Sequence, residues 1–148
     1  RVIKIKFEVD TDPPLRFSTQ ENLLIQPYSF YVKCFALPDL FAGKMHALLY
    51  RQWQNRVKGR DWFDFEWYVR KGTPLNLQHF LERARQSGDI EADTLEPAQF
   101  LDLLHERIQR LDVDSAREDV IRFIRDPDPL KIWSRDYFLQ LSTRVQFA

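Results

Sequence analysis

Lys44 is the first residue whose type and position could support chemistry. It lies on the apolar stripe of a predicted helix, at helical spacing from Leu40, Phe41 and Leu48. An ammonium in that position is poorly hydrated unless it meets an anion. Two interpretations stay open: the amine binds phosphate, for which a compact point charge is suited, or the stem packs while the amine reaches water. The spacing alone slightly favours the second.

Asp61 and Asp64 form a second pattern, three residues apart at the start of the next predicted helix. This spacing puts both carboxylates on one helix face, where a pair of acids can bind a divalent metal or act as a general base. Acids are also favoured near helix N-termini by capping and by the helix dipole. That preference accounts for Asp61 more easily than for Asp64, which lies deeper, between Phe63 and Phe65.

A basic stretch without acids lies between these two helices. Arg51, Arg56, Lys58 and Arg60 fall within ten residues that also include Trp53. Such a stretch is typical of a phosphate or nucleic-acid patch with a stacking surface. An ordinary solvated loop explains so short a run equally well.

Glu8 and Asp10 lie on one side of a predicted N-terminal strand over residues 2–9. From Ile3 onward apolar residues alternate with charged ones, and a period of two is typical of a strand with one buried face. A carboxylate on such a strand can project toward a metal. The pattern alone favours a solvated outer face.

The rest of the chain predicts one more strand and then helices. Residues 28–35 are rich in aromatic and β-branched side chains and predict the second strand, whereas residues 15–27 look irregular. Helices are expected from Pro38 to near Trp53, from Arg60 or Asp61 to Gly72, over 76–88, from Pro97, from Asp114 or Ser115, and over 130–141. The predicted class is α+β, with a short antiparallel sheet fragment in residues 1–36 and a mainly helical domain of about six helices in residues 37–148.

Composition excludes several classes of function. The 22 basic and 22 acidic residues balance, so no net charge steers the chain toward nucleic acid. Cys34 is the only cysteine, which excludes an internal disulfide and a thiolate metal cluster and fits a reducing, cytoplasmic setting. The three histidines show no metal-ligand spacing and the four glycines form no phosphate-binding loop. No apolar run approaches the length of a membrane span.

Three segments taken together resemble the AbiEii/AbiGii nucleotidyltransferase toxin family, a branch of the DNA polymerase β-like nucleotidyltransferases. They are KIKFEVD, LPDLFAGKMHALLYR and KGRDWFDFEWYV, and the match covers most of residues 1–72. The RD-x-x-D element that follows a K-x-x-A helix is the more specific part, and the strand element is weak by itself. In this family residues 1–36 would be the C-terminal part of the nucleotidyltransferase sheet.

The resemblance implies roles for five residues. Glu8 would match the third metal-directed carboxylate of the family, which sits on a strand. Lys44 would match the motif lysine that contacts nucleotide phosphates, with Arg60 in support. Asp61 and Asp64 would match the RD-x-x-D motif, in which an aspartate acts as base or site organiser. We therefore expect Glu8, Lys44, Asp61 and Asp64 to converge on one site.

The resemblance also implies an activity and partners. A protein of this family would transfer NMP from an NTP to an RNA or protein acceptor with Mg²⁺, in a toxin–antitoxin or phage-defence system with an antitoxin protein. The family's glycine-rich turn and paired-aspartate motif are not in this sequence, so we expect this chain alone to show no transfer. In an extended protein that carries these motifs, substitution of Lys44 by Ala is expected to abolish activity and leave folding intact or improved. The alternative is a non-catalytic helical module that binds another protein.

Overall fold

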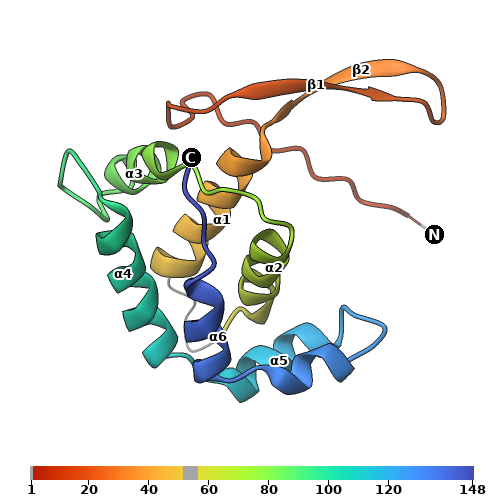
Figure 1. Cartoon of the computed structure of the whole chain (residues 1–148). Helices are drawn as coiled ribbons and strands as arrows, with labels where there is room; N and C mark the ends of the chain where they lie inside the picture. The colour runs from red at the N-terminus through yellow and green to blue at the C-terminus, as the bar shows by residue number, and fades with distance from the viewer. Residues whose placement is uncertain (1, 52–56) are drawn as a thin grey trace.

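The computed structural model describes residues 2–51 and 57–148, and these form a small sheet followed by a helical body (Figure 1). The two strands are β1 (Thr19–Leu24) and β2 (Phe30–Phe35). Within the described ranges the α-helices are α1 (Leu37–Tyr50), α2 (Gly59–Arg70), α3 (Leu77–Gln86), α4 (Pro97–Gln109), α5 (Val113–Ile121) and α6 (Arg135–Ser142), with a 3₁₀ helix η1 (Asp128–Ile132) before α6. The predicted α+β class, with an antiparallel sheet fragment and about six helices, is confirmed.

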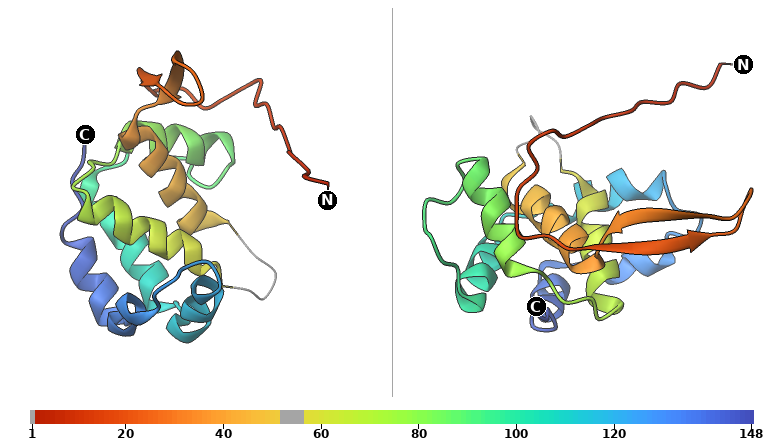
Figure 2. Two further views of the ribbon diagram at one scale, coloured as in Figure 1. Left: turned by 90° about the vertical axis from the view of Figure 1, so that its right-hand side faces the viewer. Right: turned by 90° about the horizontal axis from the view of Figure 1, so that it is seen from above.

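The strands β1 and β2 form an antiparallel hairpin that lies across one end of the helices (Figure 2). Their register runs from Thr19 opposite Phe35 to Leu24 opposite Phe30. The strand predicted over 28–35 is therefore confirmed, but its partner lies within a stretch predicted to be irregular. The sequence TQENLL has neither alternation nor β-branched enrichment apart from one Thr, so only the pairing with β2 identifies it as a strand.

The strand predicted over residues 2–9 is wrong. Residues 2–10 have no regular secondary structure, and the side chains of Ile3 and Phe7 are 83% and 88% exposed. In both views of Figure 2 this segment runs away from the helical body. Alternation of apolar and charged residues gives a segment two different faces. A strand also needs a neighbouring strand whose backbone bonds its N–H and C=O groups. Among the described strands β1 and β2 pair with each other, and neither pairs with residues 2–9.

Helix α1 is the centre of the helical body, and it packs against α2, α3 and α4. Pro38 occupies its first turn, where a missing N–H is tolerated. Phe41, Met45 and Leu48 point into the core, at the spacing that predicted a helix here. Across the contact with α2 the ring of Phe41 stacks on that of Tyr68, with centroids 4.7 Å apart.

The first residues of helix α2 pack against α5. The helix ends just before Gly72, where its end was predicted. A Cβ on Gly59 would lie 1.9 Å from the backbone oxygen of Ala116, so the absence of a side chain at this position allows the two helices to approach. At the other end Gly72 has a φ of +67°, which glycine adopts without the steric penalty of a Cβ.

The later helices follow the predicted signals with two corrections. Helix α3 is capped by Asn76, whose side chain accepts from the backbone N–H of His79. Helix α5 begins earlier than predicted, because Asp112 rather than Asp114 or Ser115 is the cap. The helix predicted over 130–141 is interrupted: Trp133 is extended and Ser134 caps a new helix, α6. No helix in the described parts of the chain has the length and apolar character that crossing a membrane requires.

Candidate functional site

Lys44 lies between α1 and α2 and contacts both predicted aspartates. Its Nζ is 2.9 Å from Oδ1 of Asp61 and 2.7 Å from Oδ2 of Asp64. The three residues come together because Lys44 leaves α1 on the side that faces α2, and because Asp61 and Asp64 share the face of α2 that packs against α1. The amine is thus held by two carboxylates, while the side chain of Lys44 remains 27% exposed, and its binding of phosphate remains a prediction.

The two aspartates differ in burial, in the opposite order to the one predicted. The side chain of Asp61 is 6% exposed and that of Asp64 is 43% exposed. Asp61 does not cap its helix, because the N-cap residue is Lys58 and no side-chain cap bond forms there. The deeper position one turn later belongs to Phe65, which is fully buried. Asp61 is thus the inner acid of the site and Asp64 the outer one.

Lys44 is a permanent cation in this arrangement. Burial lowers its pKa, but the hydrogen bonds that it donates to Asp64 and Asp61, together with the negative charges of these two residues, raise the pKa above its usual value. A lysine of this kind does not act as a proton acceptor or amine nucleophile near neutral pH. The ammonium of Lys44 can hold the two carboxylates in place, and the part of it that is exposed to solvent can attract an anion.

Among the described basic residues of the stretch between α1 and α2, Arg51 lines a pocket with Lys44, whereas Arg60 points elsewhere. Arg60 turns toward α5, where its guanidinium lies 4.4 Å from the ring centroid of Phe123 and its Nε lies 3.8 Å from Oδ2 of Asp119. The phosphate role predicted for Arg60 remains a prediction. Trp53 and Arg56 lie outside the described residues.

Glu8 is separate from the other predicted site residues in this structure. It belongs to the extended segment 2–10, its side chain is 75% exposed, and it pairs with Lys6. The structure therefore brings Lys44, Asp61 and Asp64 together without Glu8. Its metal-binding role also remains a prediction.

A pocket of ≈ 280 Å³ adjoins Lys44 on the side of α1 that faces α3. Phe35 at the end of β2 forms one edge, and three cations contribute to the lining: Lys44, Arg51 and Arg83. Sequence reasoning did not identify Arg83. Its place on α3, one turn after His79 on the face toward α1, could have been found only by knowing that α1 and α3 pack together.

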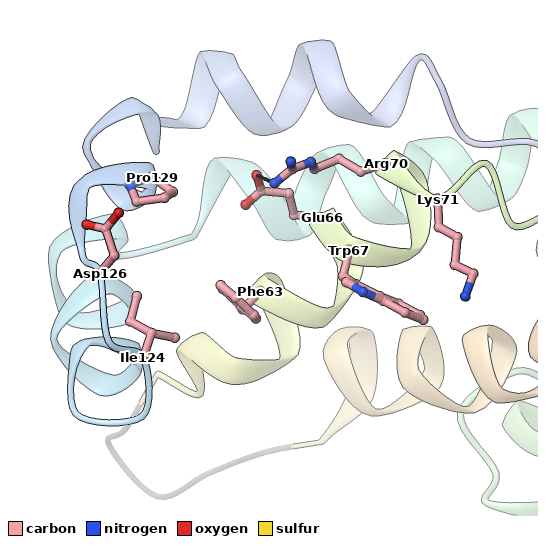
Figure 3. Close-up of a pocket in the computed structure, with 8 residues that line it drawn as sticks. All are labelled: Phe63, Glu66, Trp67, Arg70, Lys71, Ile124, Asp126 and Pro129. Atoms are coloured by element: carbon pink, nitrogen blue, oxygen red, sulfur yellow. Dashed lines mark ion pairs between the residues drawn. The ribbon is translucent and has the colours of Figure 1, made fainter.

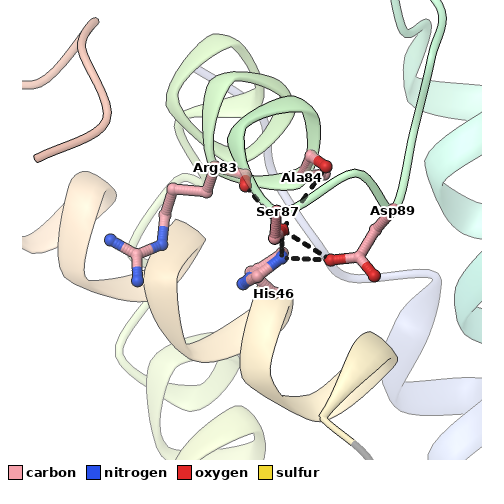
Figure 4. Close-up of polar contacts among 5 residues, drawn as sticks. All are labelled: His46, Arg83, Ala84, Ser87 and Asp89. Carbon is pink, nitrogen blue, oxygen red and sulfur yellow. Dashed lines mark hydrogen bonds and ion pairs between the residues drawn. The ribbon is translucent and has the colours of Figure 1, made fainter.

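His46, Ser87 and Asp89 form a cluster with the residue types of a hydrolase triad (Figure 4). Its geometry is different: Oγ of Ser87 and Oδ2 of Asp89 both lie 2.9 Å from the same ring atom, Nε2 of His46. In a catalytic triad the acid binds one ring nitrogen and the serine the other. The cluster instead ties α1 to the C-terminal end of α3.

A larger hollow of ≈ 460 Å³ lies on the other side of α2 (Figure 3). Phe63, Trp67 and Arg70 of α2 line it together with Ile124 and Pro129 from the segment after α5. Its floor includes the buried carboxylate of Glu66, which accepts hydrogen bonds from Nε1 of Trp133 and from the hydroxyl of Tyr137 at 2.8 Å each. The two carboxylate oxygens of Glu66 therefore tie α2 to Trp133, which follows η1, and to Tyr137 of α6.

The described residues do not supply a metal site. No group of three or more His, Cys, Asp or Glu side chains within residues 2–51 and 57–148 is arranged to hold an ion. Asp61 and Asp64 are near each other, but the ammonium of Lys44 occupies the space between them.

These features define an α+β protein whose helical body presents a lysine–diaspartate site beside a cationic pocket. The model of the family described as nucleotidyl transferase AbiEii toxin, type IV toxin–antitoxin system, matches residues 1–141. The chain belongs to this family, which implies an antitoxin partner. No curated protein and no solved structure gives a match.

Proposed function

We propose that this chain takes part in transferring NMP from an NTP to a hydroxyl group of an RNA or protein acceptor, as a cytoplasmic toxin that an antitoxin protein controls. The observation that carries the proposal is the position of Lys44. Its charge is fixed by Asp61 and Asp64, and it also lines a pocket that two arginines share. Family membership adds the type of reaction.

In the proposed reaction the acceptor oxygen forms a bond to the α-phosphorus of the NTP. The bond from that phosphorus to its bridging oxygen breaks, and pyrophosphate leaves with the electron pair. Lys44 stabilises the negative charge on the phosphates, because a preorganised cation in a partly dry site acts more strongly than one in water. Asp64, the more exposed acid, takes the proton of the hydroxyl, and Asp61 keeps Lys44 in place.

Mg²⁺ is expected for this class of reaction, but the described residues do not fit it. Glu8 lies apart from the two aspartates, which are themselves engaged by Lys44. We assign no step of the reaction to a metal held by these side chains.

The structure changes what we expect of Lys44→Ala. Removing the ammonium would leave the nearly buried carboxylate of Asp61 without its partner, and an unpaired buried charge destabilises a fold. The variant should therefore melt earlier than the parent chain, contrary to the expectation from the sequence that folding would be intact or improved. Activity must be compared at a temperature at which the variant is folded.

A nucleotide-transfer assay tests the proposed function. The product of the full reading frame that encodes this chain is incubated with each labelled NTP and Mg²⁺, and label on RNA or protein is measured. We expect Lys44→Ala and Asp64→Ala to lower the transfer rate by about 100-fold. Asp64→Ala leaves the buried contact between Lys44 and Asp61 in place, so a lower transfer rate in this variant is not explained by loss of folding.

Lys131→Ala is the matched control, since Lys131 is exposed and its only described ion-pair partner is Asp128. The 148-residue chain alone should show no transfer. Folded Lys44→Ala and Asp64→Ala proteins that both transfer at the parent rate would refute the proposal.

A second function, protein binding without catalysis, is favoured by the exposed apolar side chains of the hairpin. Leu23 and Tyr31 lie opposite each other in the register and are 53% and 71% exposed, and exposed apolar surface is typical of a binding site. This function would be supported if the full product binds an antitoxin tightly and transfers no nucleotide.

A further inference from the structure

Arg83 is a partly buried cation in the pocket beside Lys44. It leaves α3 toward α1, and in Figure 4 its side chain extends away from the Ser87–Asp89 pair and alongside the helix that carries His46. Its Nε is shielded from solvent and has no hydrogen-bond partner among the described residues. Buried donors of this kind are uncommon, because each loses water without gaining an acceptor.

Positive charges face one another across this pocket. Burial lowers the pKa of Arg83, the charge of Asp10 raises it, and the charge of Arg51 lowers it. Lys44 lines the same pocket. Asp39 lines it too, but its carboxylate already accepts hydrogen bonds from Ser18 and Asn76. The charge of Asp10 and the carboxylates that hold Lys44 offset part of the repulsion between these cations, and an anion bound beside Arg83 would offset more of it.

The guanidinium of Arg83 lies next to Gly43 of α1. A Cβ at this position would lie 3.6 Å from both Cζ and Nε of Arg83, which is ordinary contact. The guanidinium therefore lies close over the helix at Gly43. Its position next to Lys44 and Arg51 in the lining of one pocket is set by α1 and α3 packing together.

We propose that Arg83 is a phosphate ligand, and that the pocket between α1, α3 and the end of β2 takes the polyphosphate chain of a nucleoside triphosphate. A guanidinium can donate two parallel hydrogen bonds to one phosphate group, and the pocket is large enough for such a group. That the phosphates belong to a nucleotide rests on the proposed function, whereas the anion site rests on the pocket itself.

Calorimetric titration of the 148-residue chain with inorganic tripolyphosphate tests the inference. We expect binding that weakens as salt is added, and a dissociation constant that rises about tenfold in Arg83→Gln. Arg85→Gln is the matched control, because Arg85 lies on the same helix but pairs with Asp93 at the surface. Equal tripolyphosphate affinity in the parent and in folded Arg83→Gln would overturn the inference.

Gly43→Asp provides a second variant that does not remove the arginine. Its carboxylate would lie beside the guanidinium and compete with the phosphate. We expect weaker tripolyphosphate binding without a lower melting temperature. Undiminished binding by this variant would place the anion elsewhere and overturn the inference.

Three further results separate this inference from the proposed function. If tripolyphosphate binding depends on Arg83 but the full product transfers no nucleotide, the anion site stands and the proposed function fails. If transfer needs Lys44 but Arg83→Gln does not change tripolyphosphate binding, the proposed function stands and the anion site at Arg83 fails. If a single-stranded RNA binds through Arg83 and tripolyphosphate does not, the assignment to a nucleotide is wrong.

Discussion

Lys44 holds two aspartates that differ in their exposure to solvent. The ammonium of Lys44 is the ion-pair partner of Asp61, whose side chain is only 6% exposed. Asp64, at 43% exposure, is hydrated on one side and is available to another molecule. The inner pair therefore supports the structure, whereas the outer carboxylate and the remaining exposed edge of the lysine can take part in a reaction.

This difference predicts unequal effects on stability when each acid is neutralised. Asp61→Asn should lower the free energy of unfolding by about 2 kcal/mol, because it weakens a charge-assisted bond at a buried position. Asp64→Asn should change it by less than about 1 kcal/mol, because a partly exposed ion pair is screened by water. Urea unfolding of both variants measures the difference. A larger loss in Asp64→Asn would show that the outer acid is the structural partner of Lys44.

At the scale of elements, the contact between α2 and α5 depends on Gly59. The site residues Asp61 and Asp64 follow it within the first turns of α2, so the approach of the two helices sets where these carboxylates lie. The first atom that a Cβ on Gly59 would meet is a backbone oxygen, 1.9 Å away. A backbone atom cannot rotate aside as the end of a side chain can, so the helices would have to separate.

Gly59→Ala should therefore destabilise the protein by about 3 kcal/mol, at the upper end for an overpacked contact. Gly43→Ala is the matched control: its Cβ would make only ordinary contacts at 3.6 Å or more, and alanine favours a helix over glycine by up to about 1 kcal/mol. Thermal or urea unfolding gives both values. If the two variants have equal free energies of unfolding, α5 can move away from α2 without destabilising the protein.

The sequence predicted the elements whose signals are local. Pro38, Asn76 and Gly72 mark helix ends through their own backbone preferences, and the apolar spacing of α1 placed Lys44 toward its neighbours. The strand β1 and the cluster around Arg83 could not be predicted, because each is defined by a partner distant in the sequence. The relative burial of Asp61 and Asp64 depends in the same way on how α2 packs against α1.

At the scale of the whole molecule, Asp39 joins the hairpin to the helical body. It is 2% exposed, and its Oδ2 accepts from the N–H and the hydroxyl of Ser18 at 2.8 and 3.1 Å. Its Oδ1 accepts from Nδ2 of Asn76 at 2.6 Å, and the same nitrogen donates to the oxygen of Arg16. The segment before β1, the first turn of α1 and the cap of α3 thus share one carboxylate.

Asp39→Ala should loosen the hairpin before the body unfolds. Two part-buried hydrogen bonds, from the N–H of Ser18 and from the amide of Asn76, would lose the carboxylate as acceptor, at a cost of about 1–2 kcal/mol. Relative to the parent protein, we expect amide exchange to accelerate more in β1 and β2 than in α4 and α6. Hydrogen-exchange mass spectrometry can measure this difference. Asp136→Ala, an exposed first-turn acid of α6, is the control. Uniform acceleration across the whole chain would show that Asp39 supports global stability alone.

The packing of α2 on α6 has a consequence for how the protein is made. The rings of Trp62 and Phe65 lie 4.9 and 6.5 Å from that of Phe138, which is translated much later. At about 5–20 residues per second, a ribosome needs roughly 4–15 s to synthesise the stretch between them. During that interval the nascent chain carries the aromatic face of α2 without its final cover. Chaperones that recognise apolar segments can bind this face during that interval.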